Sequence, residues 1–230
     1  MRSAGCIFND IVDKDFDKKV KRTKNRPIAS GKITVKHSLV YVSILCLLAL
    51  MVLLQFNLLT VILGMSSMLL AFSYPYMKRY TYWPQLFLGI TFNWGIIMAW
   101  AAVNNNISHE IIALYISAIF WTLGYDTIYG AQDMKDDEII GVKSTSIKFK
   151  ENMKVFVSSS YFLTLIILGY LFYNELGINI LSFFLILFAI SLLFQLILFE
   201  QTKPDKCLTA FKMNNFSGLI LFLGILSKNF

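Results

Sequence analysis

Residues 178–199 read INILSFFLILFAISLLFQLILF, a run in which no side chain carries a charge. A helix of roughly 20 apolar residues crosses the hydrocarbon core of a bilayer, so this run predicts a membrane-spanning helix. The chain contains further runs of the same character. We expect seven spans, at 38–55, 58–76, 85–103, 110–130, 154–173, 178–199 and 208–227.

Composition supports a membrane protein over the whole chain. Of its 230 residues, 57% are apolar or aromatic and 15% are charged, against about 45–50% and 25% in soluble domains. Continuous runs favour helices, because the strands of a membrane barrel alternate apolar and polar residues. A helix also pairs its own backbone polar groups inside lipid. The predicted fold is an all-α integral membrane bundle of about seven transmembrane spans.

The basic side chains predict the orientation of this bundle. All of the 21 lysines and arginines except Lys228 lie in 1–37, 77–84, 131–154 and 200–213. With seven spans, these four segments fall on one side of the membrane, which the positive-inside rule makes the cytoplasmic side. The C-terminus is then outside. Contact with anionic lipid explains the same charge, and a nucleic-acid partner is disfavoured because no recognition motif accompanies it.

The acidic side chains gather in two short clusters on the predicted cytoplasmic side. In the first, Asn9, Asp13 and Asp17 repeat every four residues and would share one face of a helix. In the second, a 4-3-4 spacing predicts one helical face at the end of the fourth span. Its members are Asp126, Gly130, Asp133 and Asp137. Because both clusters lie on the same side, we expect them to face one another.

Like charges stacked on a helix repel, and a hard divalent cation relieves that repulsion. Mg²⁺ prefers carboxylate, water and phosphate oxygens, so we predict Mg²⁺ ligands at Asn9, Asp13, Asp17, Asp133 and Asp137. Cationic side chains that can bind phosphate oxygens occur nearby, at Arg22, Arg26, Lys78, Arg79 and Lys143. Together these residues suggest a diphosphate held at the mouth of an apolar bundle. The alternative is a solvated acidic face with topology-setting lysines.

Three longer motifs resemble those of a known family. The first is RSAGC at 2–6 with NDxxDxxxD at 9–17 and KRTxxRPxxSG at 21–31; the second lies at 74–89 and begins YPxMKR; the third begins YDTxYxxQDxxDD at 125 and ends GxKST at 141–145. In this order they resemble the UbiA-type intramembrane prenyltransferases, and among these the 4-hydroxybenzoate polyprenyltransferases of ubiquinone biosynthesis.

The resemblance implies a fold of nine spans around a central cavity. We therefore expect residues 1–230 to form a single prenyltransferase domain that lacks the family's first helix and most of its second. It also implies an enzyme of the bacterial inner membrane that uses Mg²⁺. The implied reaction moves a polyprenyl group from polyprenyl diphosphate to the ring of 4-hydroxybenzoate.

Roles for individual residues follow from the implied reaction. Arg22, Lys78, Arg79 and Lys143 would offset charge on the departing diphosphate, Tyr129 would lie near the allylic cation, and Asp126 is a candidate base for the ring proton. Homogentisate or a naphthoate as acceptor, and an inactive fragment or assembly partner, stay open as alternatives. A transporter is disfavoured, because the acids lie at the ends of the spans and not at the membrane midplane.

Overall fold

The structure is a computed structural model that describes residues 1–20 and 23–229. All regular secondary structure in these residues is helical. They divide into two compact units, one of residues 1–107 with 136–143 and the other of residues 108–135 with 144–230. The single domain expected from the sequence stays a prediction.

The seven predicted spans are confirmed within the described residues. Each is long and apolar enough to cross a membrane. Their bounds are Val35–Leu53 (α3), Leu58–Tyr80 (α4), Pro84–Asn104 (α5), His109–Gly130 (α6), Met153–Leu171 (α9), Ile180–Leu198 (α10) and Pro204–Leu226. The last span begins four residues earlier than predicted, and Met213 divides it into α11 (Pro204–Lys212) and α12 (Asn214–Leu226).

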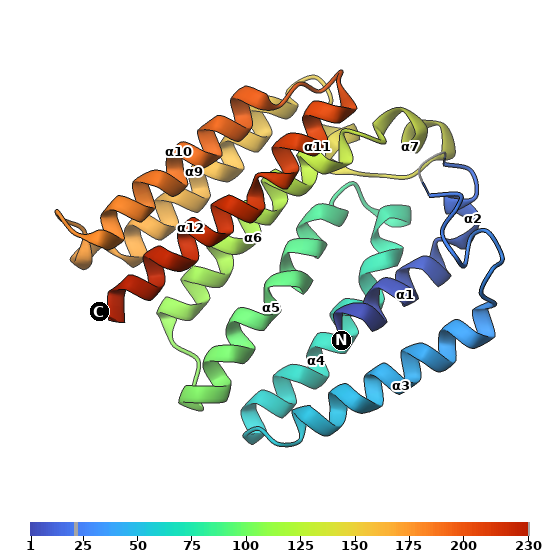
Figure 1. Cartoon of the computed structure of the whole chain (residues 1–230), viewed down its shortest axis with the longest axis horizontal. Coiled ribbons are helices and arrows are strands. Elements are labelled where there is room, and N and C mark those ends of the chain that lie inside the picture. The colour runs from blue at the N-terminus through green and yellow to red at the C-terminus, as the bar shows by residue number, and fades with distance from the viewer. Residues whose placement is uncertain (21–22, 230) are drawn as a thin grey trace. The chain divides into compact units, whose positions relative to one another are not determined.

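The first unit contains α1 (Arg2–Val12), α2 (Lys14–Asp17) and the spans α3 to α5. Helix α1 packs against α3 and α4, and α4 packs against α5 (Figure 1). Asn57 begins α4 by accepting a hydrogen bond from the backbone N–H of Thr60 at 2.9 Å. Its amide nitrogen also donates to the backbone oxygen of Ala101 at 2.7 Å. This single polar residue therefore ties the start of α4 to the end of α5.

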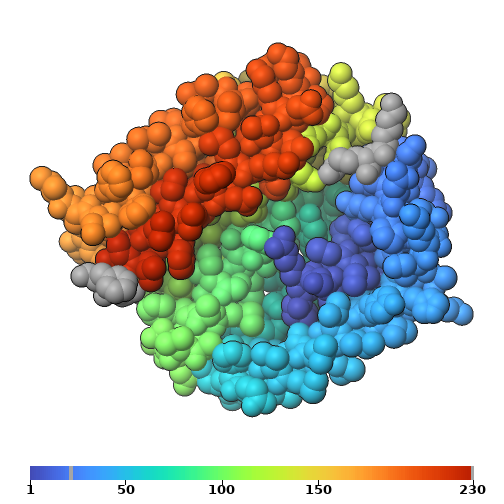
Figure 2. All heavy atoms as spheres, in the orientation of Figure 1, coloured from blue at the N-terminus to red at the C-terminus, as the bar shows by residue number. Residues whose placement is uncertain are grey.

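The second unit contains the spans α6, α9, α10 and α11–α12. Helix α6 packs against α9, and α10 lies beside α12 (Figures 1 and 2). Tyr161 is buried and donates from its hydroxyl to Oε1 of Gln195 at 2.7 Å. The amide nitrogen of Gln195 donates to the Ser217 hydroxyl at 2.9 Å. Polar side chains that bond between helices stabilise bundles in lipid, and these bonds join α9, α10 and α12.

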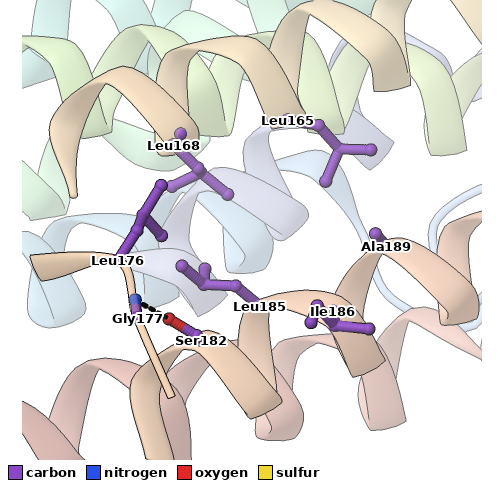
Figure 3. A pocket seen from close by; sticks show the side chains of 9 residues that line it. Leu165, Leu168, Leu176, Gly177, Ser182, Leu185, Ile186 and Ala189 are labelled. Carbon is purple, nitrogen blue, oxygen red and sulfur yellow. Dashed lines mark hydrogen bonds between the residues drawn. The ribbon is translucent and has the colours of Figure 1, made fainter. Parts of the chain in front are cut away.

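Large apolar side chains remain on the outside of both units. Leu69 of α4 is 76% exposed and Ile197 of α10 is 73% exposed. Apolar surface of this extent is expected where hydrocarbon chains surround the spans. An apolar pocket of about 390 Å³ also opens between α9 and α10 (Figure 3). It is lined by Leu165, Leu168, Leu176, Leu185, Ile186 and Ala189, among others.

Candidate functional site

The first acidic cluster keeps the helical spacing expected from the sequence. Asp13 is a turn residue between α1 and α2. Its N–H donates to the oxygen of Asn9 at 2.9 Å, and its own oxygen accepts from the N–H of Asp17 at 2.8 Å. These i to i−4 bonds continue the α-helical pattern through the turn. The spacing of Asn9, Asp13 and Asp17 is therefore kept across the break between α1 and α2, and their role as metal ligands stays a prediction.

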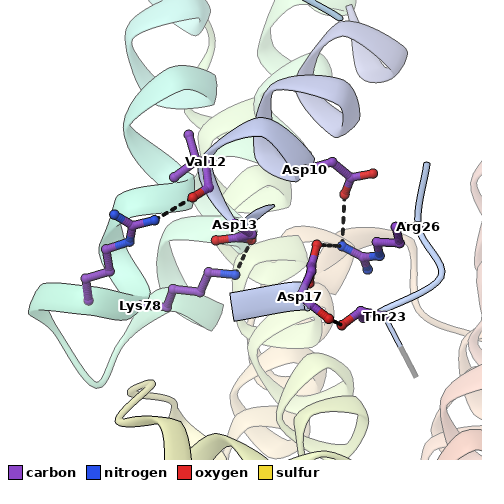
Figure 4. A network of polar contacts seen from close by, with 8 residues as sticks. Asp10, Val12, Asp13, Asp17, Thr23, Arg26 and Lys78 are labelled. Atoms are coloured by element: carbon purple, nitrogen blue, oxygen red, sulfur yellow. Dashed lines mark hydrogen bonds and ion pairs between the residues drawn. The ribbon is translucent and has the colours of Figure 1, made fainter. Parts of the chain in front are cut away.

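The carboxylate of Asp13 is the most deeply buried acid of this cluster, with 1% of the residue exposed. Its Oδ2 forms an ion pair with Nζ of Lys78, at the end of α4 (Figure 4). Its Oδ1 is buried and makes no hydrogen bond to any described residue. A buried charged oxygen without a partner is costly, so Oδ1 is placed to accept a cation or a donor.

Asp10 and Asp17 share a different cation. Nη1 of Arg26 donates to Oδ1 of Asp10 at 2.9 Å and to Oδ2 of Asp17 at 3.0 Å (Figure 4). The hydroxyl of Thr23 donates to the backbone oxygen of Asp17 at 3.0 Å. The loop after α2 thus folds back onto the acidic face of α1 and α2. Sequence reasoning noted Arg26 as a nearby cation but did not include Asp10 or Arg26 in the site.

Arg79 contacts the backbone and not the carboxylates. Its Nη2 donates to the backbone oxygen of Val12 at 2.6 Å, close to the last turn of α1. Its guanidinium carbon lies 5.1 Å from the ring centroid of Phe16. A cation at a helix C-terminus also interacts favourably with the helix dipole. Arg79 therefore joins α4 to the end of α1, next to Asp13.

Burial raises the pKa values of both Asp10 and Asp13 above the ordinary value of 3.8. The ion pair with Lys78 opposes this effect at Asp13, and the charge of Arg26 opposes it at Asp10. The neighbouring carboxylates raise both pKa values further. Burial therefore costs the ionised forms of Asp10 and Asp13 more than their pairs with Arg26 and Lys78 return.

The third motif contributes a lysine to the first unit. The N–H of Lys143 donates to the backbone oxygen of Lys78 at 2.8 Å. Its Nζ donates to the oxygen of Tyr80 at 3.3 Å and lies 5.6 Å from the ring centroid of Tyr82. Gly141 has φ of +77°, a conformation that glycine adopts without strain. This turn brings Lys143 to the end of α4 that carries Lys78 and Arg79.

The second acidic cluster does not form the single helical face that its 4-3-4 spacing predicted. Helix α6 ends at Gly130, residues 131–133 form a turn, and α7 (Met134–Ile140) follows. That interpretation was wrong because the helix is interrupted between Asp126 and Asp137. Asp126 and Asp133 belong to the second unit and Asp137 to the first. Convergence of the two clusters therefore stays a prediction.

The surroundings of α6 near Asp126 are well packed. The ring of Tyr129 lies 4.5 Å from that of Phe211 in α11, centroid to centroid. The Thr127 hydroxyl is 2.7 Å from that of Thr145, the first residue of α8 (Thr145–Lys148). The Ser146 hydroxyl donates to the backbone oxygen of Thr127 at 2.8 Å. Thr145, at the end of the third motif, and the following Ser146 are thus anchored on α6. Arg22, the remaining predicted phosphate ligand, lies outside the described residues.

The first cluster fits a divalent cation by the chemistry of its donors. Among the residues that the structure describes, no three His, Cys, Asp or Glu side chains are placed to share a metal ion. Mg²⁺ is usually bound by one or two carboxylates, with waters and substrate phosphates as the other ligands. The unpartnered Oδ1 of Asp13 offers a hard oxygen of the kind that such an ion requires.

Comparison with known sequences identifies relatives along almost the whole chain. A family model described as the UbiA prenyltransferase family matches residues 1–217. The mitochondrial 4-hydroxybenzoate polyprenyltransferase of Bos taurus is 44% identical over 100% of this chain and 62% of its own length. The chain therefore spans less than two thirds of that relative.

Solved structures show the same fold. A UbiA homolog from Aeropyrum pernix K1, in its apo form, superimposes with a TM-score of 0.84 at 22% identity, covering 100% of this chain and 86% of that one. A UbiA homolog from Archaeoglobus fulgidus, solved with DMAPP and Mg²⁺ bound, gives a TM-score of 0.71 at 18% identity, over 97% and 82% of the two chains. The all-helical membrane fold predicted from the sequence is confirmed.

Proposed function

Because the chain belongs to the UbiA prenyltransferase family, we propose that it carries out Mg²⁺-dependent transfer of a polyprenyl group from polyprenyl diphosphate to the ring of 4-hydroxybenzoate. The observation that carries this proposal is the buried carboxylate of Asp13, which is paired on one oxygen with Lys78 and has no described partner on the other. A diphosphate with its metal ion would supply a cation for the unpartnered Oδ1 of Asp13.

In this proposal each acidic cluster would bind Mg²⁺. The ligands are Asn9, Asp13 and Asp17 from the first cluster and Asp133 and Asp137 from the second. Bound Mg²⁺ supplies positive charge beside the diphosphate, which makes it a better leaving group. Lys78, Arg79, Lys143 and Arg22 add to that charge, and fixed cations that face a developing negative charge lower the barrier for its formation.

The chemical step breaks the bond between the allylic carbon and the diphosphate oxygen, and both electrons leave with the diphosphate. The ring carbon beside the phenol hydroxyl forms the new bond, and its proton is then lost. We assign Tyr129 to the neighbourhood of the allylic cation, where an aromatic face is attractive to positive charge. Asp126 is the candidate that accepts the ring proton.

The setting we propose is a membrane whose inner face carries the basic loops. The protein is an integral membrane protein, and its described residues contain seven candidate membrane spans. The positive-inside rule puts the segments with Lys78 and Lys143 at the cytoplasmic face of a bacterial inner membrane, with the C-terminus outside. Membrane lipid then surrounds the spans and also dissolves the prenyl chain of the substrate, which reaches the protein from the bilayer. A cysteine-labelling reagent that cannot cross membranes tests this orientation, because it should modify the exposed Cys6 only after lysis of intact cells.

The activity test uses the purified chain in lipid nanodiscs. Radiolabelled polyprenyl diphosphate is supplied with 4-hydroxybenzoate, homogentisate or a naphthoate, with and without Mg²⁺. We expect labelled 4-hydroxybenzoate only with Mg²⁺, and a loss of at least about 100-fold in rate for Asp13→Asn. Asp15→Asn is the matched control, because the Asp15 side chain is 87% exposed.

Three outcomes would contradict the proposal. Equal rates for Asp13→Asn and the control would remove the metal assignment. Transfer to homogentisate or the naphthoate alone would reassign the acceptor. Absence of transfer to any acid from a folded wild-type chain would favour an assembly partner.

A further inference from the structure

Arg26 bridges two carboxylates of the first acidic cluster. Both of its ion pairs use the same nitrogen, Nη1, at 2.9 Å from Asp10 and 3.0 Å from Asp17. A guanidinium nitrogen of this kind carries two hydrogens, so one atom can donate to both carboxylates. The pairs are partly shielded, since the side chain of Asp17 is 11% exposed. Arg26 therefore fixes the distance between two like charges that would otherwise repel.

The loop that carries Arg26 is itself well fixed. The N–H of Arg26 donates to the oxygen of Thr23 at 2.9 Å, and its oxygen accepts from the N–H of Ser30 at 2.8 Å. Thr23 is buried and its hydroxyl donates to the backbone oxygen of Asp17. Hydrogen bonds of its own N–H and C=O groups thus fix the backbone of Arg26. This limits the positions that its guanidinium can reach.

Asp13 lies along the chain between Asp10 and Asp17, the two acids that pair with Arg26, and its position depends on theirs. The three carboxylates come from two consecutive turns of helix, and only Asp13 has a buried oxygen without a described partner. Asp10 and Asp17, held by Arg26 on either side, limit how the turn at Asp13 can move. The ion pairs of Arg26 with Asp10 and Asp17 therefore orient the acidic face independently of Lys78, which pairs with Asp13 itself.

We propose that Arg26 is a positioning residue for the metal site: by holding Asp10 and Asp17 through Nη1, it sets the acidic face of α1 and α2 in the geometry that binds a divalent cation. This inference rests on the proposed function. Arg26 acts through the carboxylates and is not assigned to substrate or metal. Asp10, which the sequence motif leaves without a role, becomes the second anchor of this clamp.

The planar shape of the guanidinium decides which variants test the clamp. Arg26→Lys keeps the charge but replaces a rigid, planar group with a flexible ammonium. Arg26→Gln removes the charge. Asp10→Asn keeps an oxygen that can accept from Arg26. Lys18→Ala is the matched control, because Lys18 pairs with the exposed Asp15 at 3.4 Å on the same segment.

The primary measurement is binding of Mn²⁺ alone, in place of Mg²⁺, to purified protein in nanodiscs without substrate, followed by electron paramagnetic resonance. Loss of a residue that orients metal ligands typically costs 10–100-fold in affinity. We expect a loss of about that size for Arg26→Gln, a smaller one for Arg26→Lys, and a change within about threefold for Asp10→Asn. Lys18→Ala should bind as the wild type does.

A second readout separates positioning from general stability. At saturating Mg²⁺ the transfer rate of Arg26→Lys should return to within about threefold of wild type, because the metal then orders its own ligands. The thermal midpoint measured without metal should stay close to that of Lys18→Ala. If Arg26→Gln does not fold, Arg26→Lys still carries the test.

The inference is overturned if Arg26→Lys and Arg26→Gln both bind Mn²⁺ within twofold of wild type. It is also overturned if every loss in affinity is matched by an equal loss in metal-free stability. Either result leaves the proposed function intact when the wild type binds metal and transfers the prenyl group. A folded wild type that neither binds Mn²⁺ nor transfers would instead overturn the proposed function.

Discussion

The backbone N–H of Lys143 donates a hydrogen bond to the backbone oxygen of Lys78 at 2.8 Å. This contact joins the third motif to the end of α4, where Lys78 also pairs with Asp13. Two cations predicted to bind diphosphate are thus neighbours in the first unit. Their side chains have different partners, a carboxylate for Lys78 and a backbone carbonyl for Lys143, so their replacement should have different consequences.

Lys78→Ala should change metal and substrate binding in opposite directions. Among the described residues Lys78 pairs with Asp13 alone, so without it a divalent ion no longer competes with a lysine for that carboxylate. Arg26 differs because it bridges Asp10 and Asp17, and its loss lets these two carboxylates move apart. We expect tighter binding of Mn²⁺ to the substrate-free protein, by about tenfold or roughly 1.4 kcal/mol. We expect a higher KM for polyprenyl diphosphate, because the phosphate loses a cation. Weaker Mn²⁺ binding than in the exposed-site control Lys32→Ala would contradict this account of the ion pair.

Lys143→Ala should keep the local fold, because its contact with Lys78 uses the backbone and not the side chain. The ammonium that donates to Tyr80 is removed. If that ammonium turns to the diphosphate when substrate binds, KM for polyprenyl diphosphate should rise about tenfold, with kcat changed less. An unchanged KM, with Lys32→Ala as the control, would make Lys143 a residue of topology and turn structure only.

Glu200, between α10 and α11, should make stability depend on acid pH. Hydrogen bonds from Lys203 and Lys206 lower its pKa to about 2 from 4.5. Because the folded state favours the ionised carboxylate, this stabilisation is complete above pH 4.5 and is lost as the pH falls from 4.5 toward 2. The thermal midpoint should therefore drop over this range, and less so in Glu200→Gln. Glu151→Gln, another acid of the same unit, should follow the wild type; equal curves for all three proteins would refute the assignment.

Gly124 of α6 should not tolerate a methyl group. A Cβ at this position would lie 2.4 Å from Cε1 of Tyr161, and Tyr161 is buried and bonded to Gln195. Gly124→Ala should therefore destabilise the protein by about 1–3 kcal/mol, measured by thermal unfolding in detergent. Gly169→Ala is the control, because a Cβ there has no atom within 4 Å. Equal loss of stability in both variants would exclude the close approach of α6 and α9 as the cause.

Local composition was enough to predict the spans. The seven apolar runs became seven spans of the described residues, the last of them divided into α11 and α12. The start predicted at residue 38 moved to Val35, because Thr34 caps α3 there. The helical spacing of Asn9, Asp13 and Asp17 could also be predicted, because it depends only on backbone hydrogen bonds between residues close together in the chain. The 4-3-4 pattern from Asp126 to Asp137 failed because helical spacing carries no sign of the turn that ends α6 at Gly130.

The partners of the charged residues could not be predicted in this way. Sequence reasoning placed Arg26, Lys78 and Arg79 near the acids, but the structure pairs Arg26 with Asp10 and Asp17, Lys78 with Asp13, and Arg79 with a backbone oxygen. The free energy of inserting a helix into lipid is a sum of contributions from consecutive side chains. The sequence alone is therefore enough to predict a membrane span. An ion pair depends on a separation of about 4 Å or less, and contacts between segments far apart in the chain, such as α1 and α4, set that distance.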